Sequence, residues 1–332
     1  MTAGSATARL GVVAIGRNEG ERLVRCMASL AGLDAVIVYV DSASADGSPD
    51  VARAVGAHVV ALDLSIPFTA ARARNAGVER LVAECPDVAL IQFIDGDCTL
   101  VPGWIDAAIA FLDAHPRAAV VCGRRREQYP DATLFNRMCD MEWDTPVGEA
   151  LACGGDALVR AAAFRAIGGY DSALIAHEEP EMCARLRAAG WTIHRIDAEM
   201  TLHDAAMTRW GQYWKRSRRG GFGFAQAWHK QGFARATDPA GPDRRALFWS
   251  LALPLGCLAL ALLLHEPLVL LLFPLGWAVQ FVRLLLREAG PWRLRLARAF
   301  GLVSGKLPEA LGVLEYALKR ASGRRMDAIL YK

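Results

Sequence analysis

The sequence lacks the cysteine pattern of a zinc site or of a disulfide-linked domain. Its eight cysteines are scattered along the chain, and no two of them form a C-x-x-C pair. We therefore expect reduced thiols, the usual state of cysteines in the cytoplasm. The chain also does not open with a basic segment followed by an apolar one, so a secretory signal peptide is not expected.

Two widespread nucleotide-binding motifs are absent as well. Neither the P-loop (G-x-x-x-x-G-K-S/T) nor the dinucleotide fingerprint (G-x-G-x-x-G) occurs in the chain. Internal repeats and low-complexity segments are also missing. The sequence therefore supports neither a P-loop fold nor a dinucleotide-binding fold.

Long apolar runs, by contrast, are present towards the C-terminus. Hydrophobic residues make up 53% of the chain, and the excess is concentrated in Ala246–Leu264 and Leu268–Leu286. Each run is about long enough to cross a bilayer with roughly 30 Å of hydrocarbon. Only residues 265–267 separate them, so we expect a two-helix membrane hairpin over 246–286. Buried core helices are the alternative.

Basic residues flank both outer ends of this hairpin. Arg244 and Arg245 precede the first run, and several arginines follow the second. The positive-inside rule then places both flanks, and the preceding 245 residues, in the cytoplasm. From Arg287 to Lys332 the chain has ten basic and four acidic residues, whereas the whole chain has a net charge of +3. We expect this amphipathic tail, 287–332, to lie on anionic lipid. Nucleic acid is not expected as a partner, because no recognised binding motif accompanies the charge.

The first 120 residues alternate between strand and helix patterns. Apolar segments predict strands at 10–15, 35–40, 58–62, 88–94 and 118–122. Helical patterns lie between them, at 20–30, 49–55, 70–84 and 104–114. The alternation predicts an α/β fold with a mostly parallel sheet covered by helices. Periodicity fades over 124–155, as expected for an insertion or an acceptor-facing region. Beyond it, 157–167 and 179–189 are predicted to be helical and 193–196 to be a strand.

An acidic triplet, Asp95-Gly96-Asp97, follows the predicted strand at 88–94. In an open α/β sheet, ligands bind at the carboxyl ends of the strands. Two carboxylates there can hold a divalent cation, Mn²⁺ or Mg²⁺, and the cation can neutralise a diphosphate. A bare D-x-D is often only a solvated turn, so the triplet alone does not establish a site.

Other polar residues follow the neighbouring strands. They are Gly16, Arg17, Asn18 and Glu19 after the first strand, and Asp41 and Ser42 after the second. Three strand ends that offer Asn18, Asp41 and Asp95 together favour a nucleotide pocket over isolated turns.

Four further features each allow two interpretations. Arg74 either faces a diphosphate or belongs to a solvated helix face. The acids Glu178 and Glu179 are either partners of a helix dipole or include a general base for an acceptor hydroxyl. His203 is either structural or a ligand of the same cation. The aromatic and basic stretch at 208–228 is either an interfacial helix or a surface for pyrophosphate and acceptor.

Taken together, six segments resemble family 2 of the inverting, GT-A-fold glycosyltransferases. In order they are VVAIGRNEGERL, VIVYVDSASADGS, ARNAGVERL, FIDGDC, GGDALVRAAAFRAIGGYD and EEPEMCARLRAAGW. The resemblance covers roughly 11–232, and membrane-associated C-terminal extensions are frequent in that family. It implies a GT-A-type sheet flanked by helices, followed by a transmembrane or membrane-embedded helical hairpin and an amphipathic tail.

The resemblance also implies roles for single residues. Nucleotide binding is expected from Gly16, Arg17, Asn18, Glu19, Asp41, Ser42, Arg74, Asp95 and Gly96. Metal binding is expected from Asp95, Asp97 and His203, with Asp97 as the direct ligand. Contacts to the acceptor or the diphosphate are expected from Asp156, Trp210 and Arg216. Glu179 is the expected base, with Glu178 as the alternative, because a glutamate replaces the aspartate usual at this position.

The expected reaction is metal-dependent, inverting transfer of one sugar from a nucleoside-diphosphate sugar to a membrane-proximal, lipid-linked glycan. The Q-x-x-R-W motif of processive synthases is absent, which favours single-sugar transfer. We expect a cytoplasm-facing catalytic domain at 1–236 and a linker at 237–245. Two other classes stay open. A nucleotidyltransferase of similar layout would release pyrophosphate, and a non-catalytic membrane scaffold would bind donor without turnover.

Overall fold

The described residues, 9–231, 242–324 and 326, divide into two units in the computed structural model. The first unit holds residues 9–128, 142–174 and 178–205, and the second holds 129–141, 175–177 and the described residues from 206 onward. The predicted domain end at 236 and most of the predicted linker at 237–245 lie outside the described residues.

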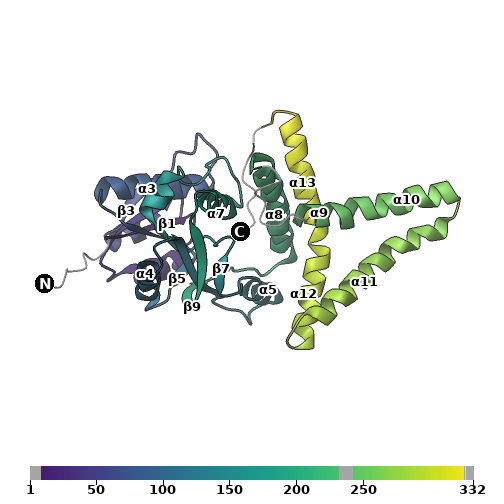
Figure 1. Ribbon diagram of the computed structural model, residues 1–332, viewed down its shortest axis with the longest axis horizontal. Helices are drawn as coiled ribbons and strands as arrows, with labels where there is room; N and C mark the ends of the chain where they lie inside the picture. Colours follow the sequence, from purple (N-terminus) through teal and green to yellow (C-terminus); the bar gives the residue numbers. More distant parts are fainter. Residues whose placement is uncertain (1–8, 232–241, 325, 327–332) are drawn as a thin grey trace. The chain divides into compact units, whose positions relative to one another are not determined.

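A mixed sheet forms the centre of the first unit (Figure 1). Its strands are β1 (Leu10–Gly16), β2 (Ala35–Asp41), β3 (His58–Ala61), β4 (Leu90–Asp95), β5 (Cys98–Leu100), β6 (Ala118–Glu127), β7 (Gly148–Ala150), β8 (Ala157–Arg160) and β9 (Thr192–His203). Hydrogen bonds join them in the order β3-β2-β1-β4-β8-β6-β9-β5, and β7 pairs with β9 beside this path.

The α/β class is confirmed, but the sheet is less uniformly parallel than the sequence indicates. Strands β1 to β4 pair in parallel, as predicted. Strand β8 is antiparallel to both β4 and β6, β6 is parallel to β9, and β5 and β7 are antiparallel to β9. The sheet as a whole is therefore mixed.

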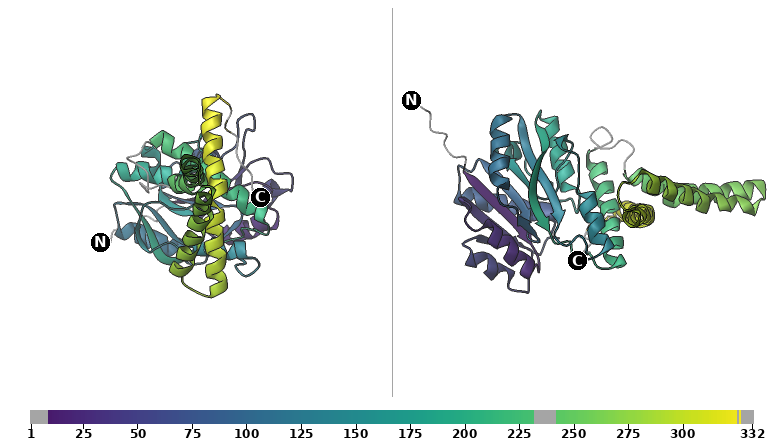
Figure 2. Two further views of the ribbon diagram at one scale, coloured as in Figure 1. Left: turned by 90° about the vertical axis from the view of Figure 1, so that its right-hand side faces the viewer. Right: turned by 90° about the horizontal axis from the view of Figure 1, so that it is seen from below.

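Helices cover both faces of this sheet (Figure 2). They are α1 (Glu21–Leu30), α2 (Ser48–Ala54), α3 (Ala70–Glu84), α4 (Trp104–Ala114), α6 (Ala161–Ala166) and α7 (Glu178–Ala188). Helix α3 packs against β1 and β2, and Gly77 permits this approach because a Cβ there would overlap Val13. Apolar side chains of the central strands, among them Val12 and Phe93, are fully buried between the layers. The near-continuous apolar runs of these strands follow from burial on both faces.

One predicted helix is partly wrong. The sequence predicts a helix over 157–167, but Ala157–Arg160 forms strand β8 and only Ala161–Ala166 is helical. The alanine-rich segment favours a helix locally. Pairing of Leu158 and Val159 with β4 and β6 overrides that preference, because both side chains are buried there.

The strands at the other side of the sheet are longer than predicted. Strand β6 continues past residue 122 to Glu127, and β9 continues past residue 196 to His203. Their register pairs Arg125 with Thr201 and Glu127 with His203. The two extensions therefore bring Arg125 and His203 to the same end of the sheet.

The described part of the second unit is helical. Its elements are most of α5 (Leu134–Glu142), α8 (Trp210–Gln231), α9 (Pro242–Leu247), η2 (Phe248–Ala252), α10 (Leu253–Leu264), η3 (Pro267–Leu271), α11 (Leu272–Arg287), α12 (Trp292–Ser304) and α13 (Lys306–Ala321). Helices α8 and α13 pack closely through Gly221 and Gly312, since a Cβ on either would overlap the backbone of the other helix. Phe222 is buried edge-on against Tyr316, with ring centroids 5.4 Å apart.

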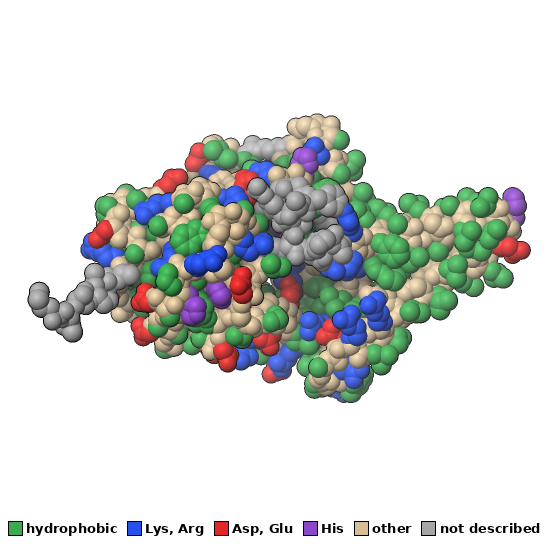
Figure 3. All heavy atoms as spheres, viewed as in Figure 1, with side chains coloured by type: hydrophobic (Ala, Val, Ile, Leu, Met, Phe, Trp, Pro, Cys, Tyr) green, Lys and Arg blue, Asp and Glu red, His purple; other side chains and the backbone are tan. Residues whose placement is uncertain are grey.

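Two helices in the described chain, Arg244–Leu264 and Pro267–Arg287, are long and apolar enough to cross a membrane. They are joined by a short turn in which His265 adopts a φ of 54° and ends α10. Their apolar side chains are exposed, with Leu263 at 74% and Leu268 at 71%, and Figure 3 shows hydrophobic side chains covering the hairpin. The two predicted apolar helices and their short connection are therefore confirmed.

Candidate active site

The polar residues that follow β1, β2 and β4 lie together at one edge of the sheet. These strands run in parallel, and their register pairs Gly16 with Asp41 and Ile15 with Asp95. Asp41 and Asp95 therefore flank the end of β1 on either side. The predicted juxtaposition is confirmed, and a role in nucleotide binding stays a prediction.

Hydrogen bonds hold the loop after β1 against the loop after β2. Asn18 N donates to Ser44 Oγ at 2.9 Å, and Ala45 N donates to Asn18 Oδ1 at 2.8 Å. Asp41 Oδ2 accepts from Ser44 N at 2.9 Å. Asn18 has a φ of 53°, in the left-handed region that asparagine tolerates better than most residues. The two loops thus form one preorganised polar wall.

Two glycines keep this edge open. A Cβ on Gly16 would lie 2.9 Å from Tyr39 Oη, and one on Gly96 would lie 3.1 Å from Ile15 O. Gly96 N instead donates to Ile15 O at 2.8 Å, and Ser42 N donates to Gly16 O at 3.0 Å. Because glycine has no Cβ, the backbone of both turns can lie close to the edge of the sheet where a ligand is expected to bind.

Two more of the charged residues predicted to bind nucleotide, Glu19 and Arg17, have partners near the same edge. Glu19 forms an ion pair with Arg22 at 2.8 Å. Arg17 is exposed, and its guanidinium lies 5.0 Å from the centre of the Phe68 ring. Their contact with a nucleotide stays a prediction.

A buried arginine joins two acidic clusters, the triplet that contains Asp95 and the pair Glu178 and Glu179. Arg74 in α3 is only 2% exposed, and its Nη2 donates to Asp95 Oδ1 at 2.9 Å. Its Nη1 donates to Glu178 Oε1 at 2.9 Å and to Glu179 Oε1 at 3.0 Å. Arg72, by contrast, donates to backbone carbonyls of the preceding loop. Arg74, and not Arg72, therefore faces the acidic residues of the site, which agrees with the first of the two interpretations of Arg74.

Glu179 is the better placed of the two acids at the start of α7 to act as a base. Its side chain is 15% exposed, compared with 5% for Glu178. Burial and the negative charge of Glu178 together raise the pKa of Glu179 to about 7, against the opposing effect of Arg74. A carboxylate that titrates near neutral pH can accept a proton from a hydroxyl efficiently.

Asp95 is held ionised by two guanidinium groups. Its Oδ1 accepts from Arg74, and its Oδ2 accepts from Arg125 Nη2, each at 2.9 Å. Burial favours the neutral acid, but Arg74 and Arg125 outweigh it and hold the pKa of Asp95 well below its usual range. Both oxygens are thus engaged by the protein.

Asp156 supports Asp95 from the protein interior. Its side chain is fully buried, with Oδ1 accepting from Asp95 N at 3.0 Å and Oδ2 accepting from Thr201 Oγ1 at 2.7 Å. Arg125 Nε lies 3.1 Å from Asp156 Oδ2, which is within ion-pair range but off the hydrogen-bond direction. The geometry makes Asp156 a positioning residue for Asp95, and its predicted contact with acceptor or diphosphate stays a prediction.

Asp97 and His203 offer ligand atoms for a cation. His203 Nε2 lies 3.2 Å from Asp97 Oδ2, and one ligand atom each of Asp97, Cys98 and His203 lie within 4.8 Å of one another. Burial and the charge of Arg125 lower the pKa of His203 to about 3, so its ring is neutral. Among the described residues, its buried Nδ1 has no hydrogen-bond partner.

These donors fit the predicted Mn²⁺ or Mg²⁺. A carboxylate is a ligand that both ions accept, and a neutral imidazole adds a nitrogen donor. Burial raises the pKa of the Cys98 thiol well above its usual range, so Cys98 stays a neutral thiol and a poor ligand for such ions. Asp97 and His203 are therefore better placed to hold the cation than Asp95, whose oxygens are occupied by arginines.

Two residues of this site are not predicted by the sequence. The Arg125 guanidinium lies 5.3 Å from the centre of the Trp143 ring, and that ring packs edge-on against His203 with centroids 4.6 Å apart. The only signal for Arg125 is its place in a run of three arginines after a strand. Trp143 lies in the segment without periodicity, so nothing in the sequence marks it.

Gly155 brings its backbone against the centre of the site. A Cβ there would lie 2.5 Å from Arg74 Nη2, 2.9 Å from Asp95 Oδ2 and 3.2 Å from Glu179 Oε1. We expect Gly155→Ala to lower kcat/KM by roughly 10- to 100-fold, because it displaces the guanidinium that positions both acids. Steady-state kinetics measure this. Gly154→Ala is the matched control, since a Cβ at Gly154 meets nothing within 4 Å. Equal losses in the two variants would contradict the positioning role.

Trp210 and Arg216 lie on α8, in the second unit. The Trp210 ring packs against those of Tyr213 and Phe300, with centroids 5.2 and 5.6 Å away. Their predicted contact with acceptor or diphosphate stays a prediction.

Comparison with known proteins relates part of the chain to glycosyltransferases. Residues 12–160 match the model of Glycosyl transferase family 2. The pre-mycofactocin glycosyltransferase of Mycobacterium tuberculosis is 27% identical over 208 residues, which amount to 57% of this chain and 41% of that protein. The match therefore spans less than half the length of that curated relative.

A solved structure shows the same fold. The mannosyltransferase PcManGT from Pyrobaculum calidifontis superposes on 96% of this chain and 88% of its own, with a TM-score of 0.57 and 18% sequence identity. At that identity the likeness concerns the fold, and it agrees with the GT-A layout described above. Residues 12–160 therefore form a domain of the Glycosyl transferase family 2 type.

Proposed function

We propose that this chain is a glycosyltransferase that transfers a single sugar, with inversion and with the help of a divalent cation, from a nucleoside-diphosphate sugar to a lipid-linked glycan. The observation that carries the proposal is the position of Arg74. It joins Asp95, at the donor edge of the sheet, to Glu179, a potential base for the acceptor. One site thus has the groups for both substrates.

The donor binds against the wall formed by the loops after β1 and β2. Asn18 can donate and accept hydrogen bonds with a base or ribose, and Asp41 can accept them; the pair suits uracil and guanine about equally. The diphosphate lies towards Asp97 and His203. PcManGT was crystallised with GDP-Man and Mn²⁺, which supports a donor and a cation of these kinds.

Asp97 and His203 are the residues that hold the cation. When bound, a divalent cation offsets the negative charge that develops on the leaving nucleoside diphosphate. Arg125 and Asp156 keep Asp95 fixed beside this position. The protein residues therefore supply a preorganised edge for a diphosphate.

Glu179 accepts the proton of the acceptor hydroxyl as the hydroxyl oxygen attacks the anomeric carbon. The C–O bond to the acceptor forms while the bond to the diphosphate breaks, and the two electrons of that bond leave with the diphosphate. Attack from the face opposite the leaving group inverts the anomeric configuration. Arg74 holds the base in place and limits how far Glu178 raises its pKa.

The apolar hairpin supports a location of this protein at a membrane. Its leucines, among them Leu263 and Leu268, are exposed, and a contiguous exposed apolar patch is typical of a membrane or protein contact site. Arginines at both outer ends favour an orientation with these ends, and the catalytic unit, in the cytoplasm. An acceptor carried by a lipid is the natural substrate of an enzyme fixed at that surface.

The proposal is tested by the fate of a labelled sugar. The detergent-purified chain is incubated with a labelled nucleoside-diphosphate sugar, Mn²⁺ and a lipid extract, and the product is partitioned between organic and aqueous phases. We expect label in the organic phase, and an anomeric coupling in the NMR spectrum of the product opposite to that of the donor. Full transfer to a water-soluble acceptor without added lipid would refute the lipid-linked acceptor, and retained configuration would refute inversion.

A further inference from the structure

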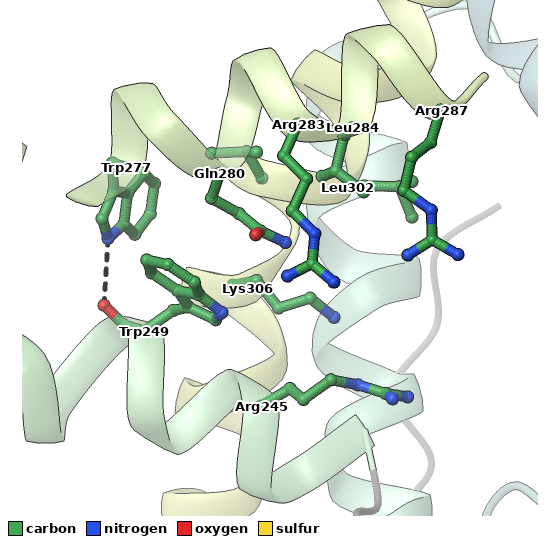
Figure 4. A pocket seen from close by; sticks show the side chains of 10 residues that line it. Arg245, Trp249, Trp277, Gln280, Arg283, Leu284, Arg287, Leu302 and Lys306 are labelled. Carbon is green, nitrogen blue, oxygen red and sulfur yellow. Dashed lines mark hydrogen bonds between the residues drawn. The ribbon is translucent and has the colours of Figure 1, made fainter. Parts of the chain in front are cut away.

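A cationic pocket lies at the base of the hairpin in the second unit (Figure 4). It has a volume of about 340 Å³. Its lining residues come from the first apolar span, from α11 and from the α12–α13 region, and they are Arg245, Trp249, Trp277, Gln280, Arg283, Leu284, Arg287, Leu302, Val303 and Lys306. Figure 4 shows the charged ends of Arg245, Arg283 and Lys306 directed towards one space.

Four positively charged side chains line this pocket, and this concentration of charge favours the binding of an anion. Lys306 forms an ion pair with Glu309, which offsets one of the charges. For Arg283 and Arg287, no acidic partner lies within ion-pair range in the part of the chain that the structure describes. Both arginines are exposed on α11 and stand one helical turn apart. The uncompensated charge is therefore concentrated on the α11 side of the pocket.

Apart from Gln280, the rest of the lining is apolar or aromatic. Leu284, Leu302 and Val303 form an apolar wall beside the cations. Trp277 Nε1 donates to Trp249 O at 3.0 Å, which fixes the two helices of the hairpin to each other at the pocket. A pocket with cations on one side and hydrocarbon on the other matches a ligand that combines a phosphate with an apolar chain.

The position of the pocket along the two proposed membrane spans agrees with such a ligand. Arg245 lies at the beginning of the span Arg244–Leu264, and Arg283 and Arg287 lie in the last turns of the span Pro267–Arg287. These positions are at the same end of the hairpin, where lipid headgroups meet an embedded helix pair. Tryptophan is enriched at that level of a bilayer, and arginine is enriched in the cytoplasmic segments that flank membrane spans.

We propose that this pocket binds the phosphate group of an anionic lipid headgroup. The proposal rests on the membrane embedding proposed above and goes beyond it, because it assigns a specific lipid site. Arg283 and Arg287 bind the phosphate oxygens, and the apolar wall contacts the first carbons of the acyl chains. A free phosphate has the same charge but cannot use the apolar wall, so the lipid binds more tightly than inorganic phosphate.

Native mass spectrometry of the full chain in neutral detergent tests the site. The probes are phosphatidic acid, phosphatidylcholine and inorganic phosphate. The test variant is Arg283→Gln/Arg287→Gln. The matched control is Arg293→Gln/Arg324→Gln, which removes the same charge from exposed arginines outside the pocket. Flotation with phosphatidylcholine vesicles reports on embedding separately, and nucleotide release reports on catalysis.

We expect one phosphatidic acid to be retained per chain, in preference to phosphatidylcholine. The pocket variant should bind it about 30-fold more weakly, the equivalent of about 2 kcal/mol for two cations near the membrane surface. The control should stay within about twofold of the unmodified chain. An equal loss in the control would overturn the proposal in favour of a general basic surface. Equal affinity for phosphatidylcholine, or displacement by an equal concentration of inorganic phosphate, would also overturn it.

Discussion

Replacing Glu179 with glutamine is expected to reduce kcat by about 10²- to 10⁴-fold, the contribution typical of a general base. The amide keeps the size of the side chain but cannot accept the proton of the acceptor hydroxyl. Because Glu179 lies beside the donor edge but is not proposed to bind the nucleotide, donor affinity should change little. Steady-state transfer kinetics and donor-binding calorimetry measure the two quantities. Transfer that stays within tenfold of normal would place the base elsewhere.

The pH dependence provides an independent check on this assignment. Since the pKa of Glu179 is about 7 and only the carboxylate accepts a proton, kcat/KM should rise with pH through that value. Glu178→Gln removes the like charge that helps to raise this pKa, so the midpoint should move to lower pH. A midpoint that does not move, together with loss of kcat in Glu178→Gln, would make Glu178 the base.

Arg74→Gln is expected to destabilise the first unit by about 3–5 kcal/mol, the cost of leaving a buried charge unpaired. Arg74 is almost fully buried and is the shared partner of Asp95, Glu178 and Glu179. Without it, three carboxylates of like charge face one another, and at least one must take up a proton. Thermal unfolding followed by circular dichroism measures the loss.

The matched control for this prediction is Arg80→Gln, on the same helix. Arg80 is exposed and pairs with Glu84 one turn away, an interaction worth about 0.3–0.5 kcal/mol. We expect it to unfold at nearly the same temperature as the unmodified chain. If Arg74→Gln were no less stable than this control, the buried ion network would not hold the two acidic clusters together.

The sequence predicts which residues lie at the ligand-binding edge of the sheet, because their positions follow from a local and regular strand pattern. Strands β1, β2 and β4 are near-continuous apolar runs, and parallel strands present their carboxyl ends at one edge. Asn18, Asp41 and Asp95 follow those ends, so their proximity can be inferred before any coordinates are known.

Other parts of the site depend on long-range packing and are not predictable in this way. Strand β8 opens an alanine-rich segment, 157–167, that is helix-like by composition, and pairing with β4 and β6 makes its first four residues a strand. Which of three consecutive arginines faces the site depends on the register of β6 with β9, and this register selects Arg125. The closeness of Gly155 to Arg74 likewise exists only in the folded chain.

The pocket at the base of the hairpin is likewise not predictable from the sequence alone. In the sequence Arg283 is an interruption of an apolar run, and Lys306 lies far along the tail. Only the folded second unit brings them to one space. A count of charges predicts a basic membrane surface, but it does not distinguish a surface from a defined site.

The central claim, metal-dependent transfer from a nucleoside-diphosphate sugar, is tested most directly by nucleotide release. The detergent-purified chain is incubated with a panel of UDP- and GDP-sugars, with Mn²⁺ or with EDTA, alongside Asp97→Ala and the exposed control Asp113→Ala. We predict release of a nucleoside diphosphate from one donor with Mn²⁺, its loss with EDTA and in Asp97→Ala, and normal release in Asp113→Ala. Release of pyrophosphate, or release that persists with EDTA and in Asp97→Ala, would contradict the account.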